Sequence, residues 1–412
     1  MRSCSVDRLR VAAHALRIAL IALALSLLGA LGGCRCGGGG GSDAGATDAA
    51  ATDAGASDAG PRYAATPIGL AVGPTTVYVT GAALDATFTP GPGFVAAIDR
   101  SSNTETDRAV TSAPQPQFLA FDPTNDALLV ASSGIVDFSM FPAVFLSAAG
   151  AVDVYPATDL AVSTSIPLML GAGPQPAGGG LGPIAAAALP GGGSIVFGGS
   201  ALTGDLYSFD PAAGTVLAGP ASPIAFFAVS TGFTGVHETA SGLVVTDFST
   251  DDLCVGGDPA ADLAGATCVN LRADPGTPIG VQKVCSFAGP VLWAIANLSG
   301  ELLSVSPNGT GFDVLRVDLG GAVDPQGLSC GADGIIYVTL SFGQDRIARF
   351  DPADSSLDLA WLALPAGATP RDVVVAGPPP YSGYVAASGN DTVVVFDVAT
   401  AAITDTIPIA AP

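Results

Sequence analysis

The sequence has few of the residue types that bind nucleic acids or build metal and acid–base sites. Its 412 residues contain one lysine, Lys283, two histidines and three glutamates, and the formal net charge at pH 7 is −22. Nucleic-acid binding rests on cationic side chains that neutralise phosphates, so such an acidic chain does not fit that class. The charge favours solubility and says nothing about the fold.

Long apolar runs are also absent, apart from one near the N-terminus. Ile18 to Leu31 is uncharged and follows four arginines, but at this length it is too short for a typical membrane-spanning helix. It predicts a signal peptide over residues 1–33. Leu31-Gly32-Gly33-Cys34 resembles a bacterial lipobox, which implies lipid attachment at Cys34, although an ordinary secretory signal with an incidental cysteine is the alternative.

The resemblance implies an exported protein that contacts the membrane through its lipid alone. Arg35, rather than aspartate, follows the cysteine and favours the outer membrane. Residues 34–62 are rich in glycine and alanine, with an aspartate every five residues from Asp43 to Asp58. Such a segment cannot build a core, so we interpret it as a flexible acidic linker.

Residues 63–412 contain an internal repeat, and together they are long for a single ordinary core. Each unit opens with proline and a short apolar run, followed by a β-rich segment, a third strand that often ends in Asp-Pro, and a return strand. The unit starts are Pro67, Pro116, Pro183, Pro278, Pro325 and Pro370. The interval from Pro183 to Pro278 has room for a further, degenerate unit, whose second strand begins at Leu243 and whose third begins near Cys268. The pattern therefore predicts an all-β fold, a seven-bladed β-propeller of four-stranded antiparallel blades, with six or eight blades as alternatives.

The last unit, from Gly389 to Ile409, resembles the YVTN-type propeller repeat, with its Asn-Asp-Thr-Val run and threonine-rich return strand. This resemblance implies a propeller fold and leaves the function open, because propellers include enzymes, scaffolds and binding proteins.

Propeller topology predicts which connections share a face. With strands a to d in each blade, the a–b and c–d turns lie on one face and the b–c and d–a connections on the other. Segments 82–93, 133–150 and 249–267 are expected between strands b and c, and 168–182 between d and a, so all four would extend a single face. Long loops on one side are where repeat proteins usually bind partners.

Two loops on that face supply candidate binding residues. Four large apolar side chains lie in the 133–150 segment, which could instead be a hairpin that buries them itself. They are Phe138, Met140, Phe141 and Phe145. The 249–267 segment carries acidic residues around Cys254, namely Asp251, Asp252 and Asp258, with Asp262 nearby. Clustered carboxylates can hold Ca²⁺, but the spacing matches no known calcium loop, and we predict a solvated acidic loop with no cofactor.

Four cysteines in the body permit three disulfide pairings. Cys254 with Cys268 would close a short loop. Cys285 and Cys330 fall at equivalent places in successive repeats and would join adjacent blades. Zinc is the main alternative, although the spacing lacks a CxxC pair.

His237 and Glu238 form the one adjacent pair suited to acid–base chemistry, so they are the candidate catalytic residues if the protein is an enzyme. The sequence favours a cell-envelope binding or scaffolding module, with an envelope protein or small ligand on the long-loop face. The alternative is a metal-assisted, lactonase-like hydrolase or lyase at the propeller mouth. The oligomeric state is not specified by any of these patterns.

Overall fold

The computed structural model describes residues 63–412 apart from 87–88, 138–144, 162, 169–174, 177–179, 201–203, 226–231, 240–241, 257–265, 310, 321–322 and 342. The predicted signal peptide, lipidated Cys34 and linker therefore lie outside the described residues. In the described part, no helix is long and apolar enough to cross a membrane.

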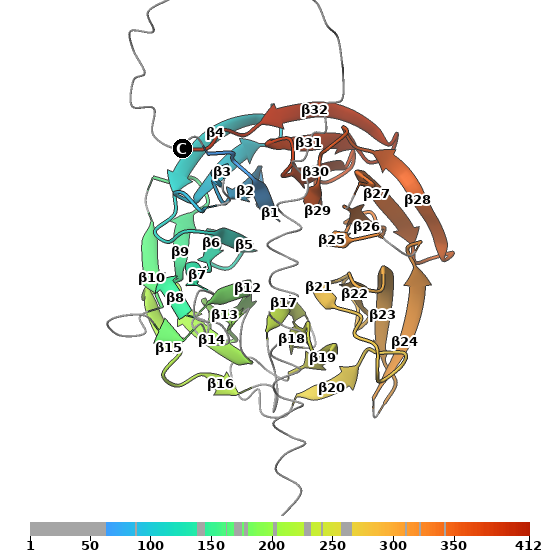
Figure 1. Ribbon diagram of the computed structural model, residues 1–412, viewed down its shortest axis with the longest axis horizontal. Coiled ribbons are helices and arrows are strands. Elements are labelled where there is room, and N and C mark those ends of the chain that lie inside the picture. The colour runs from blue at the N-terminus through green and yellow to red at the C-terminus, as the bar shows by residue number, and fades with distance from the viewer. Residues whose placement is uncertain are drawn as a thin grey trace, which may run out of the picture.

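The chain forms seven antiparallel sheets around a central axis, so the predicted seven-bladed β-propeller is confirmed (Figure 1). Blade 1 contains β1 (Pro67–Val72), β2 (Thr76–Gly81), β3 (Phe94–Asp99) and β4 (Thr104–Val110). Blade 2 contains β5 (Pro116–Asp122), β6 (Ala127–Ser132), β9 (Ala151–Pro156) and β10 (Thr164–Pro167). Blade 3 contains β12 (Leu181–Ala188), β13 (Ser194–Ser200), β14 (Asp205–Asp210) and an outer strand in two pieces, β15 (Thr215–Ala218) and β16 (Ile224–Ala225).

The remaining blades follow the same plan. Blade 4 contains β17 (Phe233–Thr239), β18 (Gly242–Asp247), β19 (Asp252–Val255) and β20 (Thr267–Asn270). Blade 5 contains β21 (Val281–Ser286), β22 (Leu292–Ala296), β23 (Glu301–Pro307) and β24 (Phe312–Asp318). Blade 6 contains β25 (Pro325–Cys330), β26 (Ile336–Leu340), β27 (Arg346–Asp351) and β28 (Ser356–Ala363). Blade 7 contains β29 (Pro370–Ala376), β30 (Ser382–Ala387), β31 (Thr392–Asp397) and β32 (Ala402–Pro408).

The apolar core is divided among the seven interfaces between blades. Each of seven clusters of buried side chains draws its members from two adjacent blades, including blades 7 and 1. Second strands such as β6 and β18 are buried at every residue, whereas the outermost strands β4 and β32 are largely exposed. A strand that packs on both neighbours must be apolar on both faces, which explains the continuous runs in the sequence.

Aspartates in b–c loops bind the start of the next blade. Asp391 accepts a hydrogen bond from the Thr66 backbone N–H at 2.8 Å and so helps to close the ring. Asp345 accepts from the Thr369 N–H at 2.9 Å, between blades 6 and 7. Asp345 and Asp391 adopt left-handed φ values of 42° and 52°, a conformation that aspartate tolerates better than most residues.

One sequence expectation about blade 4 was wrong. Its third strand is β19, which begins at Asp252, and Cys268 lies in the fourth strand, β20. The cross-strand pairing of Cys254 with Cys268 fixes this hairpin. The acidic stretch from 256 to 266 consequently connects strands c and d and not strands b and c, so it leaves and rejoins the sheet at the a–b end.

Candidate functional site

The seven innermost strands enclose a central cavity of about 500 Å³. Successive inner strands contact one another around the whole ring, and β29 contacts β1. Most of the lining is contributed by small or aliphatic side chains and by the main chain. Polar side chains line it from β5, β17, β21, β25 and β29, and include Asp122, His237, Glu238, Lys283, Ser286, Ser329 and Asp372.

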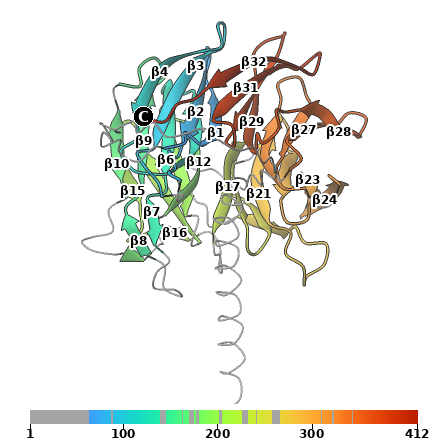
Figure 2. The ribbon, with the colours of Figure 1, turned by 45° about the horizontal axis from the view of Figure 1, so that its top comes forward.

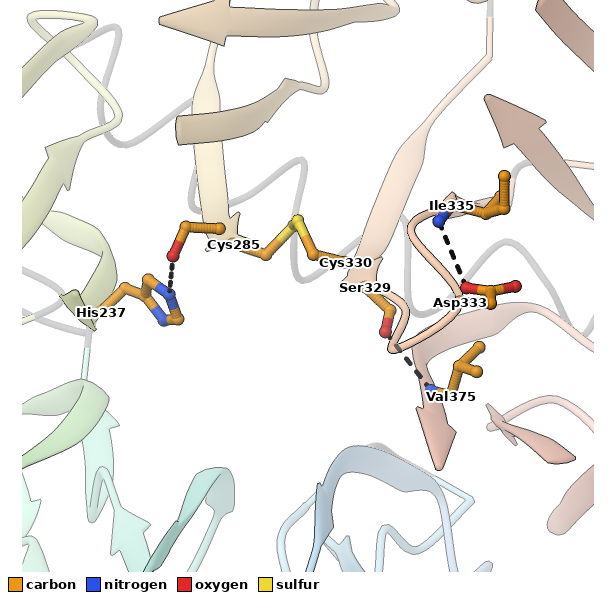
Figure 3. Close-up of a disulfide and its surroundings, with 8 residues drawn as sticks. His237, Cys285, Ser329, Cys330, Asp333, Ile335 and Val375 are labelled. Atoms are coloured by element: carbon orange, nitrogen blue, oxygen red, sulfur yellow. Dashed lines mark hydrogen bonds between the residues drawn. A yellow bond between two sulfur atoms is a disulfide. The ribbon is translucent and has the colours of Figure 1, made fainter. Parts of the chain in front are cut away.

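His237 from β17 contacts Ser286 from β21 across the interface between blades 4 and 5 (Figure 3). The distance from His237 Nε2 to Ser286 Oγ is 3.2 Å. Burial lowers the pKa of the His237 imidazole to about 4, because the charged form loses hydration there. The imidazole is therefore neutral at physiological pH, and the pair is an uncharged hydrogen-bonding unit.

Glu238, the next residue along β17, is exposed to the cavity. Within the described part of the chain it has no hydrogen bond or ion pair, and partial burial raises the pKa of its carboxyl. It is the carboxylate of the cavity that lacks a compensating partner.

Lys283 and Asp372 form an ion pair that spans an entire blade. Lys283 lies on β21 of blade 5 and Asp372 on β29 of blade 7, and Lys283 Nζ lies 2.5 Å from Asp372 Oδ1. Asp372 Oδ2 also accepts the Leu70 N–H of blade 1 at 3.0 Å. Gly327 of the intervening blade lets the backbones approach, because a Cβ there would lie 2.7 Å from the Asp372 Cα. The charges of this pair are thus already matched.

The predicted disulfides are confirmed. Cys285 and Cys330 join the inner strands of blades 5 and 6 beside the cavity (Figure 3), and Cys254 and Cys268 join β19 to β20. The first therefore constrains the wall of the channel, and the second constrains a hairpin within blade 4.

The candidate residues lie at one end of the channel. His237, Glu238, Ser286, Cys285 and Cys330 all occur near the C-terminal ends of inner strands, where the a–b turns begin. The long connections leave from the opposite, b–c end. His237 and Glu238, close to the end of β17, therefore lie at the other end of the channel from the long b–c connections.

Three of the four predicted insertions occupy the b–c face: 82–93, 133–150 and 168–182. The second and third of these segments build a small extra sheet from β7 (Ile135–Asp137), β8 (Phe145–Ala148) and β11 (Gln175–Pro176). In Figure 2, β7 and β8 project beyond the blades, at the end opposite to the β3–β4 and β31–β32 turns. The fourth, acidic segment instead connects strands c and d of blade 4, and its residues 257–265 lie outside the described part of the chain.

The apolar candidates can be placed only in part. Phe138, Met140 and Phe141 lie outside the described residues, and Phe145 is placed through the backbone of β8 alone. The prediction that they form a binding patch stays a prediction.

Among the acidic candidates, Asp251 has a structural role. It is fully buried, and its Oδ2 lies 2.6 Å from Arg272 Nε. Its carboxylate also accepts the N–H groups of Ile279, Gly280 and Val281. With its oxygens so occupied, Asp251 is not available as a surface ligand.

The other acidic candidates are less constrained. Asp252 accepts a hydrogen bond from Asn270 at 2.7 Å, and Asp258 lies outside the described residues. No group of three or more potential metal ligands occurs in the part of the chain that the structure describes.

Sequence reasoning did not find Ser286, Lys283 or Asp372. Each is a polar residue of an inner strand, but these strands also carry other polar residues such as Gln282 and Arg371, so their composition did not single them out. Their partners come from other blades, at separations of 49 residues for His237 and Ser286, and sequence spacing does not reveal such contacts.

No protein-family model matches the chain, and no curated protein matches its sequence. Several solved structures match its fold. A streptogramin B lyase has 12% identity and a TM-score of 0.54, over 79% of this chain and 92% of that one. A 6-phosphogluconolactonase candidate from Bacteroides uniformis has 15% identity and a TM-score of 0.57, over 77% and 92%. Hydrazine synthase of Kuenenia stuttgartiensis has 14% identity and a TM-score of 0.58, over 82% and 97%. At such identities the likeness establishes a propeller fold alone.

Proposed function

We propose that this chain is an exported lipoprotein, anchored through Cys34, whose YVTN-like propeller binds an envelope protein on the b–c face of blades 1 to 3. The observation that carries the proposal is the uneven distribution of insertions. Segments 82–93, 133–150 and 168–182 leave from the same face of neighbouring blades, and the last two add the β7–β8–β11 sheet to the blade framework. The repeats themselves do not require this sheet, because blades 5 to 7 form complete sheets without one.

The position of the anchor supports the same proposal. A lipidated Cys34 followed by the linker through residue 62 would hold the propeller near a membrane while leaving its faces accessible. A multiply acylated cysteine is a stable anchor, whereas a single acyl chain binds membranes marginally.

A second candidate function, a hydrolase or lyase at the channel, draws support from one contact. Ser286 and His237 lie within hydrogen-bonding distance, as a nucleophile and its base do. An imidazole whose pKa is about 4 is a weak base at neutral pH, since general bases work best with a pKa near the working pH. The pair is better suited to holding a ligand than to removing a proton, and this favours the binding function.

The partner surface can be tested by replacing residues 136–147 with a short Gly-Ser turn and comparing crosslinked partners in intact envelopes. The matched control shortens residues 257–265, the c–d insertion on the opposite face. We expect the first variant to lose a partner that the second retains. If both variants crosslink to the same proteins as the wild type, the b–c face is not the binding surface.

The anchor is tested separately by Cys34→Ala. The wild type should incorporate labelled palmitate and sediment with membranes, whereas the variant should be soluble in the periplasm. An unlabelled wild-type protein would refute the lipid anchor without affecting the assignment of the binding face.

The enzymatic alternative has its own test. A hydrolase that used Ser286 would react with a fluorophosphonate probe, and the reaction would disappear in Ser286→Ala. We expect no labelling of the folded wild-type protein. Labelling that depends on both Ser286 and His237 would instead favour the enzyme.

A further inference from the structure

The interface between blades 7 and 1, which we call the seam, is the place where the ring closes. Each blade takes its strands from one continuous stretch of the chain, so the chain itself joins neighbouring blades at the other six interfaces. Blade 7 ends with β32 and blade 1 begins with β1, and among the described residues no strand is exchanged between them (Figure 1). The seam is therefore held by a shared apolar cluster and by polar contacts between the two blades.

Two of the polar contacts at the seam involve blades 7 and 1 alone. Asp391 accepts a hydrogen bond from the Thr66 N–H at 2.8 Å, near the b–c end. The Tyr384 hydroxyl donates to Asn103 Oδ1 at 3.3 Å, where blade 7 meets the c–d turn of blade 1. In blade 7 both contacts start from the second strand, β30, or from the loop that follows it. They do not hold the inner strands β29 and β1 to each other.

At the channel, the contact across the seam is charged and includes a third blade. Asp372 Oδ2 accepts the Leu70 N–H of blade 1 at 3.0 Å, and Asp372 Oδ1 lies 2.5 Å from Lys283 Nζ of blade 5. The Asp372 side chain is only 10% exposed. A carboxylate so buried is costly unless it is paired and hydrogen-bonded, and the lysine supplies the opposite charge. One buried group therefore holds blade 1 with one oxygen and blade 5 with the other.

Lys283 and Asp372 occupy equivalent positions in their blades. Each is the third residue of its inner strand, a position that is glycine in blades 1, 4 and 6. The full set is Gly69, Phe118, Pro183, Gly235, Lys283, Gly327 and Asp372. Gly327 allows β25 and β29 to lie close together, because a Cβ there would be 2.7 Å from the Asp372 Cα. This close approach brings Asp372 within reach of a lysine from the far side of blade 6.

We infer that Lys283 controls the opening of the ring at the seam, although it belongs to neither of the blades that separate there. Without the ammonium, the buried carboxylate loses its ion-pair partner and is stabilised by turning into the cavity that it lines, where water hydrates it. Asp372 then releases the Leu70 N–H, and the inner strands β29 and β1 part. The interfaces that the chain bridges stay closed, so the opening is local.

The same ion pair makes the opening sensitive to ionic strength. Lys283 and Asp372 both line the central cavity, and the lysine side chain is 27% exposed. Salt ions that enter the cavity screen an accessible ion pair, whereas they act little on the uncharged contact between Tyr384 and Asn103. The seam should therefore open more often at high salt than at low salt.

Hydrogen–deuterium exchange of the purified full-length protein tests the inference, with fragmentation in the mass spectrometer that separates the Thr66, Leu70 and Thr369 amides. Lys283→Met keeps most of the side-chain length and removes the charge. We expect exchange at Leu70 and Thr66 to become about tenfold faster, because both amides lie at the seam. Exchange at Thr369, which Asp345 holds between blades 6 and 7, should not change.

Three results would overturn the inference. Faster exchange at Leu70 with no change at Thr66 would mean that the lysine supports one hydrogen bond and does not control the seam. An equal acceleration at Thr369 would mean that the substitution loosens the whole ring. Unchanged exchange at Leu70 would mean that Asp372 holds blade 1 without the lysine.

A matched control removes a cation that does not reach the seam. Arg349→Met breaks the ion pair with Asp351, which lies within β27 of blade 6 at 3.5 Å. Exchange at Leu70 and Thr66 should keep the wild-type rates in this variant. An acceleration as large as that in Lys283→Met would show that the loss of any ion pair loosens the seam.

The wild-type protein provides a second test that does not depend on the folding of a variant. Rising salt should accelerate exchange at Leu70 and Thr66 relative to Thr369, because it screens the pair of Lys283 and Asp372. Ratios of exchange rates that stay constant from low to high salt would contradict control of the seam by this ion pair.

Discussion

The two ends of the propeller hold their blades together in different ways. At the b–c end, aspartates in the loops bind the start of the next blade, as Asp251, Asp345 and Asp391 do. At the a–b end, several turns carry aspartates that bind their own turn, as Asp99 binds Ser101 and Ser102. The b–c end therefore uses these carboxylates between blades, whereas the c–d turn aspartates bind their own turns; Asp122, at an a–b turn, is an exception that accepts a hydrogen bond from Ser194 of the next blade.

The interface between blades 5 and 6 shows what replaces such an aspartate. The b–c loop of blade 5 offers Asn297, which donates to Asp324 at 3.1 Å, while its buried Oδ1 accepts no hydrogen bond from the described part of the chain. At the opposite end of the same interface lies the Cys285–Cys330 disulfide. The interface between blades 5 and 6 therefore has a disulfide at its a–b end and a weaker hydrogen bond, from Asn297 to Asp324, at its b–c end.

The largest effect should come from removing that disulfide. Cys285→Ser with Cys330→Ser frees a loop of 45 residues, for which the chain-entropy model gives a loss of about 4 kcal/mol in unfolding free energy. The pair Cys254→Ser with Cys268→Ser spans 14 residues and should cost about 3 kcal/mol. Chemical denaturation of both double variants measures the difference. A larger loss from the blade 4 pair would mean that the disulfide between blades is not the main constraint on the channel.

A smaller loss is expected from Asp251→Asn at the b–c end. The substitution leaves Arg272 without its buried partner and supplies one acceptor oxygen in place of two, at a cost of about 3 kcal/mol. The matched variant on the a–b face is Asp397→Asn, in which the amide oxygen can still accept the Thr400 N–H. Thermal unfolding should show a clear decrease for the first variant and little change for the second. Similar decreases would remove the distinction between the two ends.

The sequence was sufficient to predict what repeats from blade to blade. The Pro-apolar starts and Asp-Pro turns identified the strands, and the equivalent positions of Cys285 and Cys330 identified the disulfide between blades. These features are local, or recur at fixed spacing, so each blade supports the interpretation of the next.

The sequence was insufficient where a single blade departs from the repeat. In blade 4, a strand of four residues, Asp252–Val255, is too short to show alternation, so its acidic connection was assigned to the wrong face. The channel site also depends on contacts between blades. Lys283 and Asp372 are 89 positions apart in the chain and meet because the ring brings β21 and β29 together.

The end of the channel can also be probed through pH. Folding keeps His237 neutral, with a pKa of about 4 against an ordinary 6.5, so the unfolded chain binds its proton more readily. This contribution to stability is complete above pH 6.5 and is lost as the pH falls toward 4. The nearby ionisable groups, Glu238 and Lys283, are common to the wild type and to a His237→Gln variant.

The wild type should therefore lose about 2 kcal/mol more than His237→Gln between pH 7 and pH 4.5, when unfolding free energies are compared at each pH. If the unfolding free energies of the wild type and His237→Gln changed in parallel with pH, the imidazole would be hydrated in the folded protein. This end of the channel would then be as exposed to solvent as the turns of the a–b face. Crossing or diverging profiles would locate a buried imidazole at this end.

The smallest effect concerns ring closure at the b–c end, where Asp391 combines a left-handed backbone with a hydrogen bond to Thr66. Asp391→Ala removes the hydrogen bond. It also leaves an alanine at positive φ, where aspartate is tolerated because its polar side chain can hydrogen-bond locally, so the unfolding free energy should fall by about 2 kcal/mol. Asp391→Gly removes the same hydrogen bond but tolerates the backbone, so its cost should be about 1 kcal/mol. The difference between these two variants in denaturant unfolding isolates backbone strain from the contact between blades 7 and 1. If glycine restores the wild-type value, the loop conformation alone sets this closure and the hydrogen bond between blades 7 and 1 adds nothing; if alanine and glycine lose equally, the left-handed backbone carries no measurable strain.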